Sequence, residues 1–333
     1  MSEVENRTDV LVDALRYAVR APSVHNTQPW RWRIRRCGVE LYADWTRHLP
    51  WTDPDRRDLV LSCGAALHHL RVALAAAGLA VRVDRLPDPD KAGHLATVTI
   101  EPGPGDAELA TLLPSISRRH TERRRMSHRP VPAALLRTCM RQAEREGARL
   151  HPVTQPYPRR RLRMAISAAA HEQQLTPGYA AELQLWTSRY AGSHDGISPD
   201  TVPTPPIGLA EESPLRWFGT GRLRQPPHLA GDGPADDAAE LLIVVTDADG
   251  ELSWLRAGEA TSAALLAATG LGLSTTPLSQ AVEIETSRAQ LRRGVLNDGG
   301  IPQLILRVGW PASGADELAP TARRELRSVL LPG

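Results

Sequence analysis

The sequence predicts an α+β fold made of two fused half-units, each with a mostly antiparallel sheet wrapped by helices. Three observations favour this class. Alternating stretches joined by a short turn indicate a β-hairpin near the start of the chain, long apolar helices that end at glycine separate the strands, and one helix–strand unit occurs twice. We expect the half-units to span residues 1–112 and 113–333, the second with an insertion at about 192–235.

A polar loop lies between the first helix and the first strand. Apolar residues recur at helical spacing up to Ala18, and the ring of Pro22 forces the residue before it out of the helical region. From Trp30 to Arg35, apolar residues alternate with arginine, which is the pattern of a half-buried strand. Such a loop suits a polyol, an amide-rich ring or a phosphate ester, and the alternative is an ordinary polar connector. Its polar residues are Ser23, His25, Asn26, Thr27 and Gln28.

A hairpin and a long helix follow the first strand. A turn at residues 36–38 is followed by renewed alternation over residues 39–44. Thr52 and Asp53 offer capping side chains just before Pro54, which predicts a helix with this proline at its first position and Gly78 at its end. Further strands are expected at residues 81–86 and 96–100.

The second half-unit repeats this mixture of helices and strands. Trp186 is expected to anchor one of its helices in the core. The expected elements are a helix opened by Pro132 and closed by Gly147, a strand at 149–153, helices at 162–175 and 179–190, a buried strand at 239–246, a helix capped by Ser253 that runs to Gly270, and a strand at 303–310.

Proline and glycine dominate residues 192–235, where the regular patterns stop. Structureless loops longer than about 12 to 15 residues are uncommon in compact domains and usually act as lids or linkers. Apolar residues punctuate the segment, so we expect a lid that packs on another part of the protein; the alternative is a disordered insertion. These apolar residues are Leu209, Leu215, Trp217 and Phe218.

One helix–strand unit is duplicated. The helix from Gly64 to Gly78 parallels the helix from Gly258 to Gly272, and each is followed by a strand that closes its unit. Alanine-rich helices often look alike, so chance similarity is the alternative.

A cationic stretch occupies residues 117–129. So many arginines in a short segment indicate that an anion docks there. The alternatives are a solvated arginine face and a nucleic-acid site, but interleaved aromatic residues are absent and acidic residues elsewhere cancel the charge. We therefore expect no nucleic acid as a partner.

Composition excludes several other classes. A formal charge of +2 gives no net attraction to nucleic acid or membrane, and the three cysteines, Cys37, Cys63 and Cys139, are too far apart to indicate a disulfide framework or a zinc site. The first nine residues are polar and acidic, unlike a targeting segment, and no apolar run is expected to reach the length of a membrane span. We expect a soluble cytoplasmic protein without a metal site.

The polar loop carries a longer motif. Its string Ala-Pro-Ser-x-x-Asn-x-Gln-Pro-Trp, from Ala21 to Trp30, resembles the FMN-binding segment of the nitroreductase superfamily. The form with His25 and Thr27 is similar to the Acg-type actinobacterial branch. The segment from Arg119 to Arg123, followed by Pro130, resembles the phosphate-binding segment of a nitroreductase subunit.

This resemblance implies a nitroreductase-like fold and a single FMN at the seam of a chain folded as an internal dimer. Guanidinium groups would hold the phosphate, the loop would meet the ribityl chain and the ring edge, and residues 276–278 would run along the isoalloxazine. Arg123 would lie near N1, where relatives often have lysine. The expected cofactor-binding residues are Pro22, Ser23, His25, Asn26, Gln28, Arg119, His120, Thr121, Arg123, Thr276, Pro277, Leu278, Arg323 and Arg324.

Two functions follow from the resemblance, and a specialised dehydrogenase or oxidase of a biosynthetic intermediate is a third possibility without a substrate clue in the sequence. The first is an FMN-dependent oxidoreductase that passes hydride from NAD(P)H to a small electron-poor acceptor; the second is an FMN storage protein with a closed lid and no turnover. No catalytic side chain is expected, because the cofactor itself carries the hydride. The partners would be a small-molecule substrate and NAD(P)H, and the chain would act as a monomer.

Overall fold

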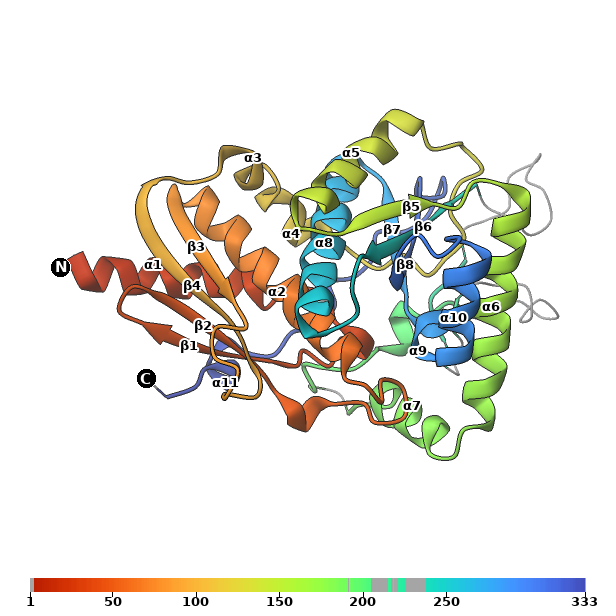
Figure 1. The fold of residues 1–333 in the computed structure, drawn as a ribbon, viewed down its shortest axis with the longest axis horizontal. Helices are drawn as coiled ribbons and strands as arrows, with labels where there is room; N and C mark the ends of the chain where they lie inside the picture. Colours follow the sequence, from red (N-terminus) through yellow and green to blue (C-terminus); the bar gives the residue numbers. More distant parts are fainter. Residues whose placement is uncertain are drawn as a thin grey trace.

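The computed structural model describes residues 3–190, 192–204, 215, 216, 218, 221–225 and 238–332. Two four-stranded antiparallel sheets flank a pair of long helices, α2 (Arg57–Ala76) and α8 (Glu251–Gly270), as Figure 1 shows. The predicted α+β class with two half-units, each holding an antiparallel sheet wrapped by helices, is therefore confirmed.

The first sheet is covered on one face. Its strands are β1 (Trp30–Arg35), β2 (Gly38–Ala43), β3 (Leu79–Arg85) and β4 (His94–Pro104), in the order β1-β2-β4-β3, and α1 (Glu3–Ala18) packs with α2 in its hydrophobic cluster. Trp30 and Trp32 are fully buried on that face, whereas Arg31 on the opposite face pairs with Asp44 at 2.8 Å. One-sided cover explains the alternation in the sequence.

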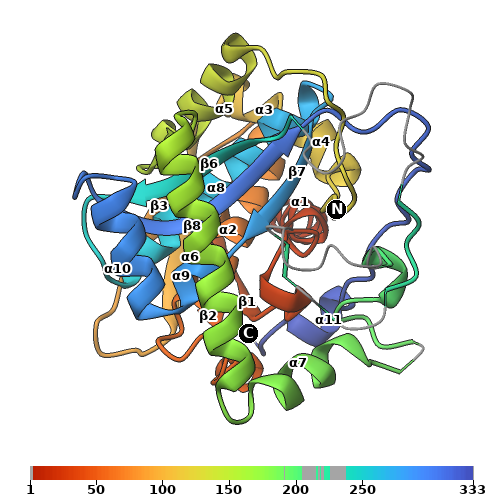
Figure 2. The same ribbon diagram turned by 90° about the vertical axis from the view of Figure 1, so that its right-hand side faces the viewer.

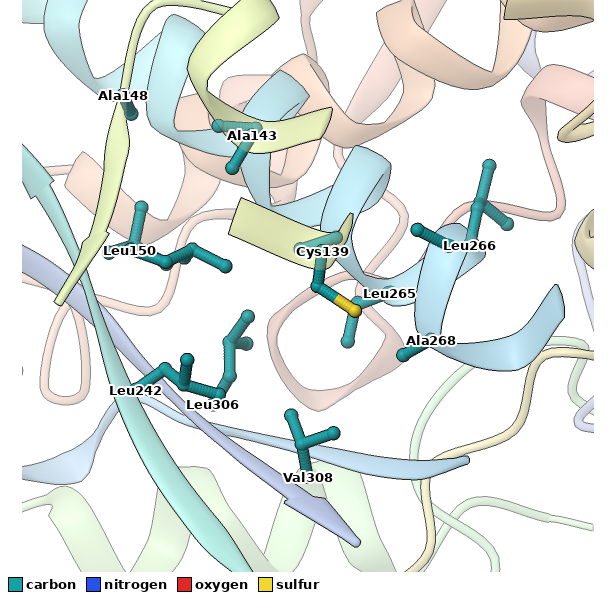
Figure 3. Close-up of a cluster of buried hydrophobic side chains, with 14 of the residues drawn as sticks. Cys139, Ala143, Ala148, Leu150, Leu242, Leu265, Leu266, Ala268, Leu306 and Val308 are labelled. Carbon is teal, nitrogen blue, oxygen red and sulfur yellow. The ribbon is translucent and has the colours of Figure 1, made fainter. Parts of the chain in front are cut away.

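The second sheet is covered on both faces. Its strands are β5 (Arg149–Pro152), β6 (Glu240–Thr246), β7 (Ser274–Leu278) and β8 (Ile301–Gly309), in the order β5-β6-β8-β7. Leu242 and Val244 point into the cluster with α5 (Ala133–Arg145) and α8, part of which Figure 3 shows. Ile243 and Val245 meet the other side, where α6 (Pro156–Leu175) crosses in Figure 2 beside α9 (Gln280–Glu283) and α10 (Glu285–Gly294). Cover on both faces explains the continuous apolar run of β6.

The two long helices touch backbone to backbone. A Cβ on Gly64 would lie 2.0 Å from the carbonyl oxygen of Leu255, and a Cβ on Gly258 would lie 1.9 Å from that of Leu61. The contact is thus reciprocal, as a two-fold relation between the half-units requires. The boundary between residues 112 and 113 stays a prediction; Leu112 on its first side belongs to the same buried cluster as α8.

Short elements complete the described chain. The C-terminal segment returns to the first half-unit, where the backbone N–H of Leu331 donates to the carbonyl oxygen of Trp32 at 2.7 Å. Trp186 is buried, as predicted. The remaining elements are α3 (Ala107–Ala110), α4 (Leu113–Arg118), α7 (Tyr179–Thr187), α11 (Leu326–Val329), and the 3-10 turns η1 (Val24–Asn26), η2 (Trp45–Arg47) and η3 (Pro199–Thr201).

Three local expectations were wrong. Pro54 lies before α2 rather than at its first position, because the Asp53 carboxylate caps from a loop and accepts hydrogen bonds from the backbone N–H groups of Asp58 (3.0 Å) and Leu59 (2.8 Å). Ser253 lies inside the first turn of α8, whose N-cap is Gly250. By length and composition α2 could span a membrane, contrary to expectation, but 89% of its apolar window is buried inside the protein.

Candidate functional site

The loop between α1 and β1 has an unusual backbone. The φ angles of His25, Asn26 and Gln28 are 45°, 54° and 52°, in the left-handed region that costs residues with a Cβ. The hydroxyl of Ser23 accepts a hydrogen bond from the backbone N–H of Gln28 at 2.9 Å, which holds the turn closed. Strain of this kind is found where a site needs a fixed shape.

The side chains of Asn26 and Gln28 form hydrogen bonds with other segments of the protein. The amide of Asn26 donates to the carbonyl oxygens of Gly196 (3.0 Å) and Ala322 (3.2 Å). The side-chain oxygen of Gln28 accepts a hydrogen bond from the backbone N–H of Arg324 at 2.8 Å. These two residues therefore tie the loop to the insertion and to the C-terminal segment, and neither is among the described residues that line the cavity beside the loop.

That cavity opens where the loop, α2 and the second sheet meet. Both half-units contribute, because Asp58 and Leu61 on α2 and Thr261 on α8 belong to its wall. It brings together the following residues of the sequence-based set: Pro22, Ser23, His25, Thr121, Arg123, Thr276, Pro277 and Leu278.

The cationic stretch runs along the edge of β7. Thr121 forms a β-bridge with Thr275, and the backbone N–H of Glu122 donates to the carbonyl oxygen of Thr275 at 2.9 Å. Alternation then separates the side chains: Thr121 and Arg123 line the cavity, while Glu122 and Arg124 form a buried ion pair at 2.7 Å. Arg124 is therefore neutralised within the protein, and the interpretation of the whole stretch as a solvated face fails at this position.

Arg119 and Arg323 form the core of a cationic cluster that also includes Arg20 and Arg123. Arg119 is buried, and its Nε and Nη1 atoms have no hydrogen-bond partner in the described part of the chain; the enclosed Nε of the half-buried Arg323 has none either. Burial, followed by repulsion from neighbouring arginines, lowers the pKa of Arg119 to about 10 and that of Arg323 to about 9. Burial also lowers the pKa of Arg123 to about 10.

This cluster has the donor set of an anion site. Among the described residues, no carboxylate forms an ion pair with Arg119, Arg123 or Arg323. Burying several cations together without a counter-ion is unfavourable, and their free N–H groups lose solvation as well. A phosphate ester would supply the missing negative charge and several strong acceptors. The residues present therefore fit a phosphorylated ligand.

The two arginines at residues 323 and 324 point in different directions. Arg324 donates to the carbonyl oxygen of Gln28 at 3.2 Å and lies 3.6 Å from the carboxylate of Asp44, whereas Arg323 joins the cluster at Arg119. His120 is half-buried, lies 2.8 Å from the carbonyl oxygen of Arg118 and is not among the described residues of the cavity wall. Burial lowers the pKa of His120, and the positive charges of Arg119 and Arg323 lower it further.

Residues of the insertion reach the cavity. Arg216 forms a buried ion pair with Glu283, and its Nη1 lies 3.2 Å from Nε2 of His25. The ring of Phe218 meets His25 edge-on with centroids 5.8 Å apart, and the Arg123 guanidinium lies 5.3 Å from the centre of the same ring. Burial lowers the pKa of His25 well below its usual value, and Arg216 and Arg123 add to this effect, so the imidazole is neutral.

The sequence interpretation missed Asp58, Arg216 and Thr261 as wall residues. Asp58 had no distinct signal, because acidic residues are common in the first turn of any helix. Thr261 had none either, because it looks like any small residue of an alanine-rich helix. The signal for Arg216 was present, because it follows Leu215 in an otherwise Pro/Gly-rich segment, and Leu215 also lines the cavity. Two other apolar residues of that segment, Leu209 and Trp217, lie outside the described residues.

The fold and the site together define a two-half α+β protein with a cavity where the half-units meet and a cluster of arginines near it. No family model matches the chain. The protein named "Putative NAD(P)H nitroreductase Rv3131" of Mycobacterium tuberculosis (strain ATCC 25618 / H37Rv) is 42% identical over 320 residues, covering 95% of this chain and 89% of that protein. "Putative NAD(P)H nitroreductase acg" of the same strain is 32% identical over 330 residues, covering 97% and 95%. The chain therefore belongs to the nitroreductase superfamily, in its Acg-type branch.

A solved structure described as a "putative nitroreductase" from Anabaena variabilis ATCC 29413 has a TM-score of 0.47 and 9% identity to this chain, over 94% of this chain and 90% of that chain.

Proposed function

We propose that the protein binds one FMN in this cavity and acts as an oxidoreductase that passes hydride from NAD(P)H to a small electron-poor acceptor. The observation that carries the proposal is the cluster of Arg119 and Arg323, which lack a counter-ion among the described residues. Neither is a described wall residue, but Arg119 lies near Arg123, which lines a cavity built by both half-units. The names of the two relatives, which describe NAD(P)H nitroreductases, agree with it.

Different residues of the site would contact different parts of the cofactor. Arg119 and Arg323 would hold the phosphate, Ser23 and His25 would face the ribityl chain, and residues 276–278 would run along the ring. Bound FMN would supply the hydride acceptance and donation. Arg123 would stabilise the negative charge that develops at the edge of the flavin ring. Because little water reaches the site, the guanidinium group would act on that charge more strongly than in solution.

NADPH reduction tests this function directly. The FMN-loaded protein, mixed anaerobically with excess NADH or NADPH, is expected to lose the absorbance of its oxidised flavin and to regain it when a quinone or nitroarene is added. Stopped-flow absorbance measures both steps. Loss of absorbance with dithionite but with neither nicotinamide would remove the oxidoreductase proposal and leave FMN binding intact.

We expect one FMN per chain because the equivalent position on the other side of the seam is filled. Ala65, the ninth residue of α2, lines the cavity, while the ninth residue of α8 is Glu259. Glu259 is fully buried and pairs with Arg71 at 2.8 Å and with Arg85 at 2.7 Å. Titration of the FMN-free protein with FMN, followed by calorimetry, should give a stoichiometry near one, and a value of two would contradict this proposal.

A storage function is the second candidate, and the contacts of Phe218 with His25 and Arg123 favour it. If residues 192–235 act as a lid, Phe218→Ala opens one of its contacts with the wall. FMN release, measured by flavin fluorescence, should then become several-fold faster, and acceptor turnover should rise. Leu185→Ala, at a side chain 58% exposed on α7, serves as the control. Release and turnover equal to wild type in Phe218→Ala would argue against a lid.

We also propose that the protein is cytoplasmic and acts as a monomer, since one chain supplies both half-units of the site. Light scattering of the FMN-loaded protein should give a mass near 36.3 kDa. A mass near twice that value would contradict the monomer.

A further inference from the structure

Asp58 places a carboxyl group on the wall of the cavity. The residue is 2% exposed and lies in the first turn of α2. Its Oδ1 accepts a hydrogen bond from Arg57 at 3.2 Å, and no N–H or O–H donor in the described part of the chain reaches its buried Oδ2. A buried carboxyl oxygen without a donor, on the wall of a ligand site, is available for a hydrogen bond with the ligand.

The surroundings of Asp58 favour its protonated form. The pKa of Asp58 is raised to about 7, chiefly by burial. The charge of Glu283 and a hydrogen bond shared by the two carboxyl groups also raise it, whereas the charges of Arg57 and Arg216 lower it. On the other side of the helix start, the carboxyl of Asp53 repels the Asp58 charge as well. With a pKa of about 7, about half of the Asp58 side chains are protonated near neutral pH, and this form can give up its proton.

We propose that Asp58 is the proton donor to the acceptor that takes the hydride, an inference that rests on the proposed function. With a quinone, two electrons and one hydrogen arrive as hydride from the reduced flavin. The O–H bond of Asp58 breaks, a new O–H bond forms on a quinone oxygen, and the quinone becomes a hydroquinone. Asp58 remains as a carboxylate, which regains its proton from water.

Other groups near the cavity are less suited to this role. His25 is neutral, and a neutral imidazole is a very weak acid. Glu283 is held as an ion pair by Arg216, and guanidinium groups keep their protons. Among the described wall residues, Asp58 thus combines an acidic proton with direct access to the cavity.

Asp58→Asn tests the proposal through the two half-reactions. The variant keeps the size of the side chain, so reduction of bound FMN by NAD(P)H should stay within about two-fold of wild type. Reoxidation by a quinone should slow by about 100-fold, within the range that a general acid contributes. In the wild type, reoxidation should fall about ten-fold per pH unit above pH 7, as Asp58 loses its proton. The variant should show no such fall.

Glu146→Gln is the matched control. It also removes a buried carboxylate, but one that pairs with Arg71, so its half-reactions should match wild type. Infrared difference spectra of the FMN-free protein give a readout independent of turnover: a protonated carboxyl band near pH 6 in wild type should be missing in Asp58→Asn. Wild-type reoxidation rates and pH profile in Asp58→Asn, or no difference in that band, would overturn the proposal.

A second variant decides the outcome if Asp58→Asn does not fold. Asp58→Glu keeps an acidic proton, so it should reoxidise with a shifted pH profile, and an unchanged profile would overturn the role of residue 58. Failure of the wild type to bind FMN or to accept electrons from NAD(P)H would instead contradict the proposed function. The two failures are therefore distinguishable.

Discussion

Arg119→Met is expected to weaken FMN binding by about 10- to 100-fold while raising the melting temperature of the FMN-free protein by a few degrees. The loss of affinity follows from removing hydrogen bonds to a charged group, which contribute about 1.5 to 3 kcal/mol each. The gain in stability follows because Arg119 is buried near other arginines and has no counter-ion among the described residues; burial and the neighbouring charges depress its folded-state pKa. A base with a depressed pKa binds its proton less well in the folded state, and this cost is present at neutral pH.

Calorimetry with FMN and thermal unfolding without it measure the two effects. The control is Arg324→Met, next to Arg323 in the chain, whose side chain turns toward Gln28 and Asp44. It should keep FMN affinity close to wild type and gain no stability, because Arg324 has partners to lose. Equal affinities for Arg119→Met and wild type would show that the phosphate lies elsewhere, and a lower melting temperature would show that Arg119 has a partner in the FMN-free protein.

The sequence predicted the fold well because each sheet shows its cover in its side-chain pattern. Trp30 and Trp32 alternate with arginine on a one-sided sheet, while the continuous apolar run of β6 belongs to a two-sided one. Helix starts were predicted less well. The chain makes an extra turn before α2 begins, with Arg56 at a φ of 63°. Asp53 therefore caps the helix from the preceding loop and does not stand directly before its first residue.

The site was predicted by segment better than by side chain. The loop, the cationic stretch and residues 276–278 do meet at one cavity, but the left-handed backbone turns Asn26 and Gln28 toward the insertion and the C-terminal segment. No local pattern reveals such a turn, because the φ angles depend on hydrogen bonds to segments remote in the chain. Arg216 differs: Leu215 before it did indicate that this part of the insertion packs on the protein, although the ion pair of Arg216 with Glu283 has no local signal.

Gly258→Ala is expected to destabilise the protein by about 3 kcal/mol or more. This substitution directly tests the contact between the two half-units. The added Cβ would lie 1.9 Å from the carbonyl oxygen of Leu61, a backbone atom that cannot rotate away. Alanine favours an isolated helix by about 1 kcal/mol over glycine, so helix propensity opposes the expected sign. The clash should win because α2 and α8 must separate along their whole contact.

Urea unfolding of the FMN-free protein measures the loss of unfolding free energy. The FMN affinity of Gly258→Ala should also fall, because Leu61 on α2 and Thr261 on α8 line the same cavity. Gly270→Ala, at the exposed end of the same helix, is the control: its Cβ would meet only the side-chain oxygen of Ser115, at 3.2 Å. It should leave stability unchanged or raise it by up to about 1 kcal/mol. A Gly258→Ala protein as stable as this control would mean that the helices are not in backbone contact, and the shared cavity would lose its structural basis.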